Sequence, residues 1–318
     1  MKLAVGFVTY QEASAKYLAD FLPSLAAALG FLDSSDFQIY VFDNSNPGDS
    51  SNSRILTAYK NIKYFRQDHN LGFAAAYNVL IREALKDAAD YFLVINPDTV
   101  MEPDTVKLLA EALDKDGSLG SAAPKILRWD FDGKRRTKTI DSLGLVLQTG
   151  LKFSDLGQGI EDDGKARNIS ILGPSGAAGL FRLSALEKVA ITPSGHVAQY
   201  FDERFFMYKE DCDLAYRLFL AGYNSCLVPE ALVYHDRTAA VSGRGVRAFW
   251  RDRQSKSRQI KAWSFRNQHL IFLKYWRKQD LVNKIAVSAR ILCLFIFSLI
   301  LEQYLLKEYP RILRLARG

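Results

Sequence analysis

The sequence of 318 residues predicts an α/β fold: a mainly parallel central sheet covered by helices, followed by a C-terminal helical tail. One observation is that short apolar segments alternate with segments whose apolar residues recur every three or four positions. The other is that the charge changes sign along the chain. Residues 1–242 hold 25 Lys and Arg against 31 Asp and Glu, whereas residues 243–318 hold 17 against 4. We therefore expect an acidic globular domain over 1–242 and a basic appendage over 243–318.

The first half of the chain contributes most of the expected sheet. Apolar segments bounded by polar residues predict strands at 3–10, 37–45, 62–66 and 91–98. Helical spacing predicts helices over 14–30, with Gly30 at the end, and over 53–60, 73–88 and 103–113. Because the strands are almost wholly apolar, both faces of the sheet are expected to be covered.

The second half is less regular. Residues 130–170 are polar and weakly periodic, which is typical of a functional loop, an edge hairpin or a mobile segment. The segment 172–182 places small residues between a strand and a helix, where a backbone can approach a ligand or a helix can pack closely. A helix over 211–221 and a strand over 227–236 complete the domain.

The composition restricts the class of protein. Hydrophobic residues make up 48% and charged residues 24% of the chain, as in packed globular proteins. The cysteines Cys212, Cys226 and Cys293 are widely spaced and form no CxxC pair, which fits a reducing cytoplasm. No charged and apolar leader opens the sequence, so we expect no signal peptide.

Two expected strands end in carboxylates. Asp43 and Asp98 follow apolar segments, and ligands of such sheets bind beyond the carboxyl ends of the strands. Turn formation is the alternative role, because Asp also bonds to its own backbone at strand ends. That alternative is weaker for Asp98, whose strand is wholly apolar.

Other nucleotide-binding motifs are missing. A nicotinamide dehydrogenase needs G-x-G-x-x-G after the first strand, and that position reads VTYQEAS here. No P-loop is found either. A nucleic-acid-binding protein would explain the basic tail and its aromatic residues but not the ordered acids of the first domain.

Nine segments together resemble the inverting family 2 glycosyltransferases, particularly their bacterial rhamnosyltransferase-like branch. In chain order they are VTY (8–10), VFDNS (41–45), HNLGFAAAYN (69–78), VINPDT (94–99), IDSLG (140–144), SGAAGLFR (175–182), FDERFFMYKEDCDLAYRL (201–218), GYNSCLVPEALVYH (222–235) and FRN (265–267). They extend over nearly all of residues 1–270, and their order and spacing make the set specific. The resemblance implies the GT-A fold and transfer of a sugar from a nucleoside diphosphate.

The resemblance also implies catalytic residues. Asp211 is the expected general base, with Glu210 beside it to orient the acceptor; an acid at a helix start also stabilises the helix, which is the competing role. Asp98 is expected to bind a divalent cation, Mg²⁺ or Mn²⁺, with His235 as a second ligand. Asn96 takes the place of the family's first metal-binding carboxylate, so the nucleotide would have to supply further oxygen ligands.

Binding residues follow in the same way. The resemblance places Asp43 at the pyrimidine base with Thr9 and Tyr10. The stretch around the ribose and diphosphate contains Asn70, Gly72, Asn78 and Asn96. Gly176, Ala177 and Arg266 are expected on the acceptor side. Arg266 would be either a phosphate contact or a plain surface residue.

The tail is expected to lie in an anionic membrane interface. Its apolar stretch, Ile291–Leu301, is shorter than the roughly 20 residues that span a bilayer, and basic and aromatic residues surround it. Packing on the domain, or on a second copy in a homodimer, is the alternative.

The sequence thus predicts a cytoplasmic enzyme, peripheral at the inner face of the membrane. It would move L-rhamnose from dTDP-rhamnose to a glycan or polyprenyl-diphosphate-linked acceptor, with no nucleic acid as partner. UDP-galactofuranose, UDP-glucose and UDP-N-acetylhexosamine stay open as donors. A non-catalytic module that binds nucleotide sugars or polyanions is the alternative from another class.

Overall fold

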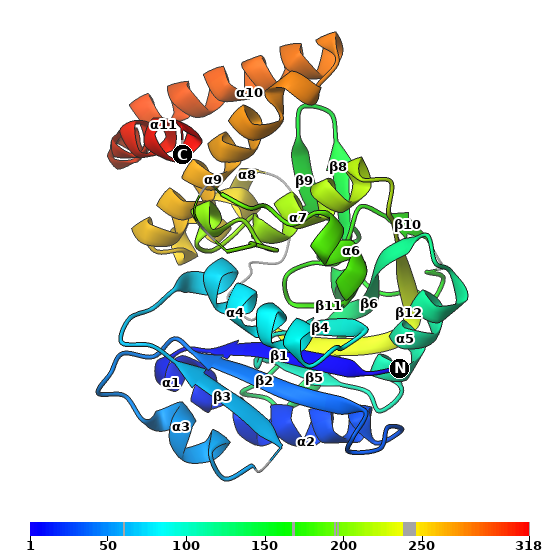
Figure 1. Ribbon diagram of the computed structural model, residues 1–318. Coiled ribbons are helices and arrows are strands. Elements are labelled where there is room, and N and C mark those ends of the chain that lie inside the picture. The colour runs from blue at the N-terminus through cyan, green and yellow to red at the C-terminus, as the bar shows by residue number, and fades with distance from the viewer. Residues whose placement is uncertain (60, 167–168, 194, 196, 238–245, 318) are drawn as a thin grey trace.

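A ten-stranded sheet lies at the centre of the molecule (Figure 1). The computed structural model describes residues 1–318 except 60, 167–168, 194, 196, 238–245 and 318. The strand order is β10-β12-β6-β11-β4-β1-β2-β3, with β5 paired to β12 and β7 to β6. The strands are β1 (Leu3–Thr9), β2 (Phe37–Asp43), β3 (Ile62–Arg66), β4 (Tyr91–Ile95), β5 (Thr99–Met101), β6 (Leu119–Asp130), β7 (Arg135–Ser142), β10 (Ser170–Ile171), β11 (Ala178–Arg182) and β12 (Asn224–Asp236).

The sheet is mixed, although its first half is parallel as expected. β1 pairs in parallel with β2 and β4, and β2 pairs in parallel with β3. β11, by contrast, runs antiparallel to both β4 and β6. A strand that is reached through loops and hairpins, without a crossover helix, is free to enter the sheet in the opposite direction.

Helices cover both faces, and each covered face forms a hydrophobic core. α2 (Leu18–Leu29) and α5 (Thr105–Lys115) pack on one side, and α4 (Gly72–Lys86), α6 (Leu183–Lys188) and α7 (Glu210–Leu220) on the other. The segment 14–30, expected to form one helix, contains the end of α1 (Gln11–Ala15) and all of α2, because the helix is interrupted between residues 15 and 18. The short α3 (Ser51–Leu56) lies beside α1.

Residues 130–170 form hairpins. β7 turns back on β6, and β8 (Leu145–Gln148) pairs with β9 (Lys152–Asp155) in a separate two-stranded sheet. The edge-hairpin interpretation of this segment is therefore confirmed.

The C-terminal region is helical and packs on the domain. It consists of α8 (Val246–Ser255), α9 (Arg258–Tyr275), α10 (Leu281–Ile300) and α11 (Glu308–Arg317). Phe265, Ile271 and Phe272 of α9 share one hydrophobic cluster with Phe205 and Tyr216 of the first domain. The domain boundary expected between 242 and 243 lies outside the described residues.

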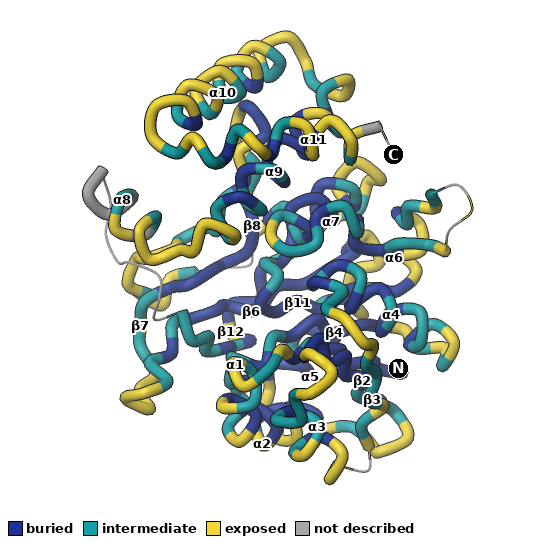
Figure 2. The backbone as a smooth tube through the Cα atoms, turned by 90° about the vertical axis from the view of Figure 1, so that its left-hand side faces the viewer, coloured by how far each residue is buried: buried dark blue, intermediate teal, exposed yellow. Residues whose placement is uncertain are grey.

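The apolar part of this region is longer than the sequence analysis expected. α10 is continuous over 20 residues, and by length and composition it could cross a membrane, with 11% of its apolar window buried. The helix begins at Leu281, ten residues before Ile291, and so includes Arg290, whose guanidinium donates to the Gly150 carbonyl, 2.7 Å away. Figure 2 shows the exposed side of this helix.

Candidate active site

A pairing of β5 with β12 brings Asp98 and His235 together, although 137 positions separate them. His235 lies opposite Thr99, and the backbone N–H of Asp236 donates to the Asp98 carbonyl at 2.9 Å. His235 Nε2 is thereby placed 3.4 Å from Asp98 Oδ2. The two residues that were expected to bind a cation are neighbours at the end of the strands.

Asp141 holds the other side of the imidazole. Its buried carboxylate is 2.8 Å from His235 Nδ1 and accepts a hydrogen bond from Arg237 at 3.1 Å. Burial disfavours a charged imidazole, but the carboxylates of Asp98 and Asp141 outweigh it and raise the pKa of His235 to about 10. His235 is therefore an imidazolium at neutral pH when no cation is bound. A cation at Nε2 would have to displace the proton from that nitrogen.

The same residues fit a divalent cation. Asp98 Oδ1 is buried and has no hydrogen-bond partner, so one carboxylate oxygen is unsatisfied within the protein. With Nδ1 bonded to Asp141, Nε2 is the nitrogen left for a ligand, an arrangement common around metal-binding histidines. Over the described part of the chain, no group of three His, Cys, Asp or Glu could hold a metal ion. A cation here would need further ligands from a bound molecule.

Asp211, the second residue of α7, has both carboxylate oxygens engaged by backbone N–H groups. Oδ2 accepts from Gly176 at 3.0 Å, and Oδ1 accepts from Cys212 at 2.7 Å. The residue stays partly exposed. A carboxylate oriented in this way keeps free lone pairs for an acceptor hydroxyl, as a general base requires.

Glu210 differs from its neighbour in environment. Its side chain is buried, and Oε2 has no hydrogen-bond partner. Burial, and then the charge of Asp211, raise the pKa of Glu210 well above its usual value. The raised pKa favours the neutral carboxyl form of Glu210.

Asp43 lies at the end of β2 and is fully buried. Oδ1 accepts hydrogen bonds from the hydroxyls of Thr9 at 3.1 Å and Ser45 at 2.6 Å, and Oδ2 accepts from Tyr64 at 2.7 Å. Arg66 is 3.5 Å from Oδ2. The bonds to Ser45 include its backbone N–H at 3.1 Å, so Asp43 also organises the turn after its strand.

The segment before α4 is held close to this pocket. Asn70 Oδ1 accepts from the N–H of Gly72 at 2.7 Å, and Asn44, which the sequence analysis did not single out, bonds to Leu71 and Gly72 at 3.0 Å each. Tyr10 is exposed beside the end of β1.

Gly176 and Ala177, expected on the acceptor side, adjoin the segment that contains Asn96. The Ala177 carbonyl accepts a hydrogen bond from the backbone N–H of Asn96 at 2.9 Å. Gly176, one residue earlier, is the donor to Asp211. This short stretch therefore links the two carboxylate sites.

Two expected ligand contacts are engaged by other groups of the protein. Asn78 is fully buried, and its amide bonds to Tyr200, Phe201 and Glu203, so it holds that segment. Arg266 lies 3.6 Å from Glu308 of α11, and that pairing fixes one helix of the C-terminal region to another.

A family model now identifies the family of this chain. The model for glycosyl transferase family 2 matches residues 5–189, more than half of the chain. This protein belongs to glycosyl transferase family 2. Its expected resemblance and its class of activity, glycosyl transfer, are thereby confirmed.

This family 2 glycosyltransferase has curated relatives. Over 251 residues it is 28% identical to the N-acetylglucosaminyl-diphospho-decaprenol L-rhamnosyltransferase of Mycobacterium tuberculosis, covering 74% of this chain and 76% of the relative. The identity is too low to carry the relative's substrates across.

Solved structures agree on the GT-A fold. TarS 1–349 of S. aureus in complex with UDP-GlcNAc aligns at a TM-score of 0.58 and 17% identity, covering 98% of this chain and 79% of that one. The mannosyltransferase PcManGT of Pyrobaculum calidifontis, in complex with GDP-Man and Mn²⁺, aligns at a TM-score of 0.52 and 16% identity. That alignment covers 99% of this chain and 75% of PcManGT. A longer TarS structure aligns at a TM-score of 0.54 and 17% identity, covering 95% of this chain and 46% of that one. This chain therefore spans about half the length of that protein.

Asp141, Asp155 and Arg237 are site residues of this glycosyltransferase that the sequence analysis did not select. Asp155 lies in β9, within 3.9 Å of Arg237, and burial raises the pKa of its carboxyl. For Asp141 the signal was the IDSLG segment, which pointed to the family without assigning a role. Asp155 and Arg237 had no such signal, because a separate hairpin and a strand end bring them together only in the folded chain.

Proposed function

We propose that this protein is an inverting glycosyltransferase in which Asp211 is the general base. The observation that carries the proposal is the partly exposed carboxylate of Asp211, oriented by the backbone N–H groups of Gly176 and Cys212. Asp211 would take the proton of the acceptor hydroxyl as that oxygen attacks the anomeric carbon. The bond from this carbon to the diphosphate breaks on the opposite face, which inverts the configuration without a covalent intermediate.

The donor would be a uridine or deoxythymidine diphosphate sugar. Asp43 and Thr9 would face the pyrimidine base with Tyr10, while Asn70, Gly72 and Asn96 would adjoin the ribose and diphosphate. Asp98 and His235 would hold Mg²⁺ or Mn²⁺, which would neutralise the diphosphate when bound. Related structures support a cation, since PcManGT and GalNAc-T7 were each solved with Mn²⁺.

L-rhamnose from dTDP-rhamnose is the proposed sugar, and a polyprenyl-diphosphate-linked glycan the proposed acceptor. The rhamnosyltransferase from Mycobacterium tuberculosis, which acts on a decaprenol-linked sugar by its name, supports both. Gly176 and Ala177 would line the acceptor side. UDP-galactofuranose, UDP-glucose and UDP-N-acetylhexosamine are the donors to compare.

The C-terminal region would hold the enzyme at the inner face of the cell membrane. The outer face of α10 exposes large apolar side chains, while its inner face packs on the hydrophobic cluster around α9 (Figure 2). The exposed residues are Leu281, Val282, Ile285, Leu292, Phe295, Ile296, Leu299 and Ile300. Exposed basic residues adjoin the helix at Arg277, Lys278 and Lys307. An apolar face beside cations suits an anionic bilayer, where a lipid-linked acceptor would be found.

In this proposal residues 1–242 carry the donor and catalytic groups and residues 243–318 the membrane contact. A second copy of the chain on α10 is the competing occupant. Sedimentation without lipid would reveal a dimer.

The deciding experiment is transfer by the full chain. Each donor is incubated with Mn²⁺ and a short polyprenyl-diphosphate-N-acetylglucosamine acceptor, and the product is analysed by mass spectrometry and NMR. We expect one donor to be used, with an anomeric configuration opposite to that of the donor. Retention of configuration would exclude the single-base mechanism, and preference for another sugar would replace rhamnose while leaving the mechanism intact.

A further inference from the structure

The loop that precedes the catalytic pair has an unusual backbone. Phe206, Tyr208 and Lys209 have positive φ angles of 53°, 72° and 73°, and none of them is glycine. Such a conformation is unfavourable for a non-glycine residue and persists only where surrounding contacts impose it. Glu210 and Asp211 follow directly, so the contacts that impose this loop also set the start of α7.

Asn267 of α9 supplies one set of these contacts. Its buried side-chain Nδ2 lies 2.7 Å from the Phe205 carbonyl, 2.8 Å from that of Met207 and 2.7 Å from that of Tyr208. An amide has two N–H donors, so the three carbonyls share them. One side chain thus satisfies three backbone acceptors of the strained loop.

The start of α4 supplies a second set. The Phe206 carbonyl accepts a hydrogen bond from the N–H of Phe73 at 2.7 Å. Gly72 approaches so closely that a Cβ there would lie 2.6 Å from the same carbonyl oxygen. The loop is therefore bridged between the helix of the proposed donor pocket and a helix of the C-terminal region.

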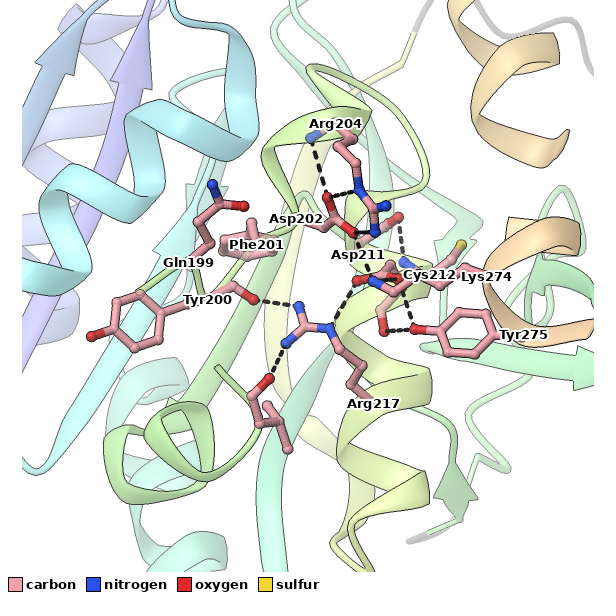
Figure 3. Close-up of polar contacts among 12 residues, drawn as sticks. Gln199, Tyr200, Phe201, Asp202, Arg204, Asp211, Cys212, Arg217, Lys274 and Tyr275 are labelled. Carbon is pink, nitrogen blue, oxygen red and sulfur yellow. Dashed lines mark hydrogen bonds and ion pairs between the residues drawn. The ribbon is translucent and has the colours of Figure 1, made fainter. Parts of the chain in front are cut away.

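α9 is itself fixed to α7, so that Asn267 has a defined position. Lys274 Nζ lies 2.7 Å from Asp202 and 2.6 Å from Asp213, and the Tyr275 hydroxyl donates to Asp213 at 2.7 Å. Figure 3 shows these side chains converging on α7. Asp213 is the buried partner of these groups. Charged pairs of this kind hold a fixed geometry because an unpaired member would be costly to bury.

We infer that Asn267 is a positioning residue for Asp211: it holds the strained 205–209 loop in the backbone conformation that presents the catalytic carboxylate. This rests on the proposed role of Asp211. It also assigns a role to the FRN segment at 265–267, in which Asn267 rather than Arg266 serves the active site. The C-terminal region is then part of the catalytic unit as well as a membrane contact.

The experiment compares N267A and N267S with I271A in the full chain. Ile271 is buried one helical turn further along α9, so I271A is a stability control that leaves the loop contacts in place. Melting temperature, donor affinity, kcat and amide hydrogen exchange of 205–213 are measured for each. For N267A we expect kcat to fall about 10- to 100-fold, as a misplaced catalytic group does. Donor affinity should stay within about twofold, and exchange in 205–213 should accelerate. N267S, which keeps one donor, should fall between N267A and the wild type.

I271A should lower the melting temperature while keeping kcat and the exchange of the loop. Unchanged exchange and kcat in folded N267A or N267S would overturn the inference, as would an equal loss of kcat in I271A. If the wild type transfers no sugar from any donor, the proposed function fails. Exchange in 205–213 then still decides whether Asn267 holds the loop, so the two failures are distinguishable.

Discussion

The Gly176 N–H donates to Asp211 Oδ2 at 3.0 Å and so connects the segment before β11 to the first turn of α7. Through the adjacent Ala177 carbonyl, the same segment accepts from the backbone N–H of Asn96. The proposed base and the proposed metal-binding segment are thereby fixed to one short piece of backbone.

Replacing the proposed base should abolish turnover without removing the fold. For D211N we expect kcat to fall by about 10²- to 10⁴-fold, since general-base catalysis contributes that much, with donor affinity nearly unchanged. Steady-state kinetics and donor titration measure the two quantities. The exposed D163N serves as the charge-matched control and should keep full activity. A D211N enzyme with wild-type kcat would contradict the assignment.

Removal of the cation should affect the wild type and the Asp98 variant differently. We expect EDTA to weaken donor binding in the wild type, because the diphosphate charge would lose its counter-ion. D98A and H235A should bind the donor weakly with or without Mn²⁺, so that EDTA changes little. Calorimetric titration with the nucleoside diphosphate, with and without Mn²⁺, tests this. Equal Mn²⁺ dependence in D98A and wild type would disprove a cation site at Asp98.

Filling the space at Gly72 should disturb the catalytic loop. Gly72 has φ +78°, and a Cβ would press on Phe206, so G72A is expected to lose about 1–3 kcal/mol of stability and part of its kcat. The matched control is G48A, because nothing lies within 4 Å of a Cβ there and its φ is not positive. Thermal unfolding and kinetics of the two variants give the comparison. Equal behaviour of G72A and G48A would show that the close approach to Phe206 is unimportant.

The stability contributed by Asp202 should depend on pH. Burial opposes its charge, but Arg204 and Lys274 outweigh that effect and hold the pKa of Asp202 well below its usual value. A carboxyl with a lowered folded pKa stabilises the protein above its unfolded pKa, about 3.9, and loses this effect as the pH falls further. D202N should therefore be less stable than the wild type by about 3 kcal/mol at pH 7, and the gap should narrow below about pH 4. Denaturant unfolding at pH 7, 5 and 3.5 measures it; a gap independent of pH would count against the ion pairs.

The exposed face of α10 should bind anionic bilayers. The double variant L292E/I296E places two charges on this face and should reduce flotation with phosphatidylglycerol vesicles at least tenfold. Val197 is also exposed but lies far along the chain from α10, so V197E is the control for a new surface charge. Binding of the wild type should weaken as salt is raised or when neutral vesicles replace anionic ones. Wild-type flotation by L292E/I296E would place the membrane contact elsewhere.

Much of the parallel half of the sheet and its helices could be predicted from the sequence. Local periodicity located β3 at its observed bounds, 62–66, and the other early strands to within a few residues. Asp43 and Asp98 could be selected because strand ends are visible as changes of pattern, whereas Glu210 and Asp211 were selected through the resemblance to the family. These features depend on residues that are neighbours in the chain.

The side-chain contacts that only the tertiary structure decided depend on pairings between distant segments. The approach of His235 to Asp98 requires the β5–β12 pairing, and the support of His235 by Asp141 requires a hairpin on β6. In the same way, no local pattern distinguishes Asn267, which binds the strained loop, from Arg266, which pairs with Glu308. The sequence by itself determined the family, the order of elements and the candidate carboxylates, because these depend on local composition and spacing. Which side chain meets which was decided by long-range packing, because a side chain's partner depends on the register and direction of segments that are far apart in the chain.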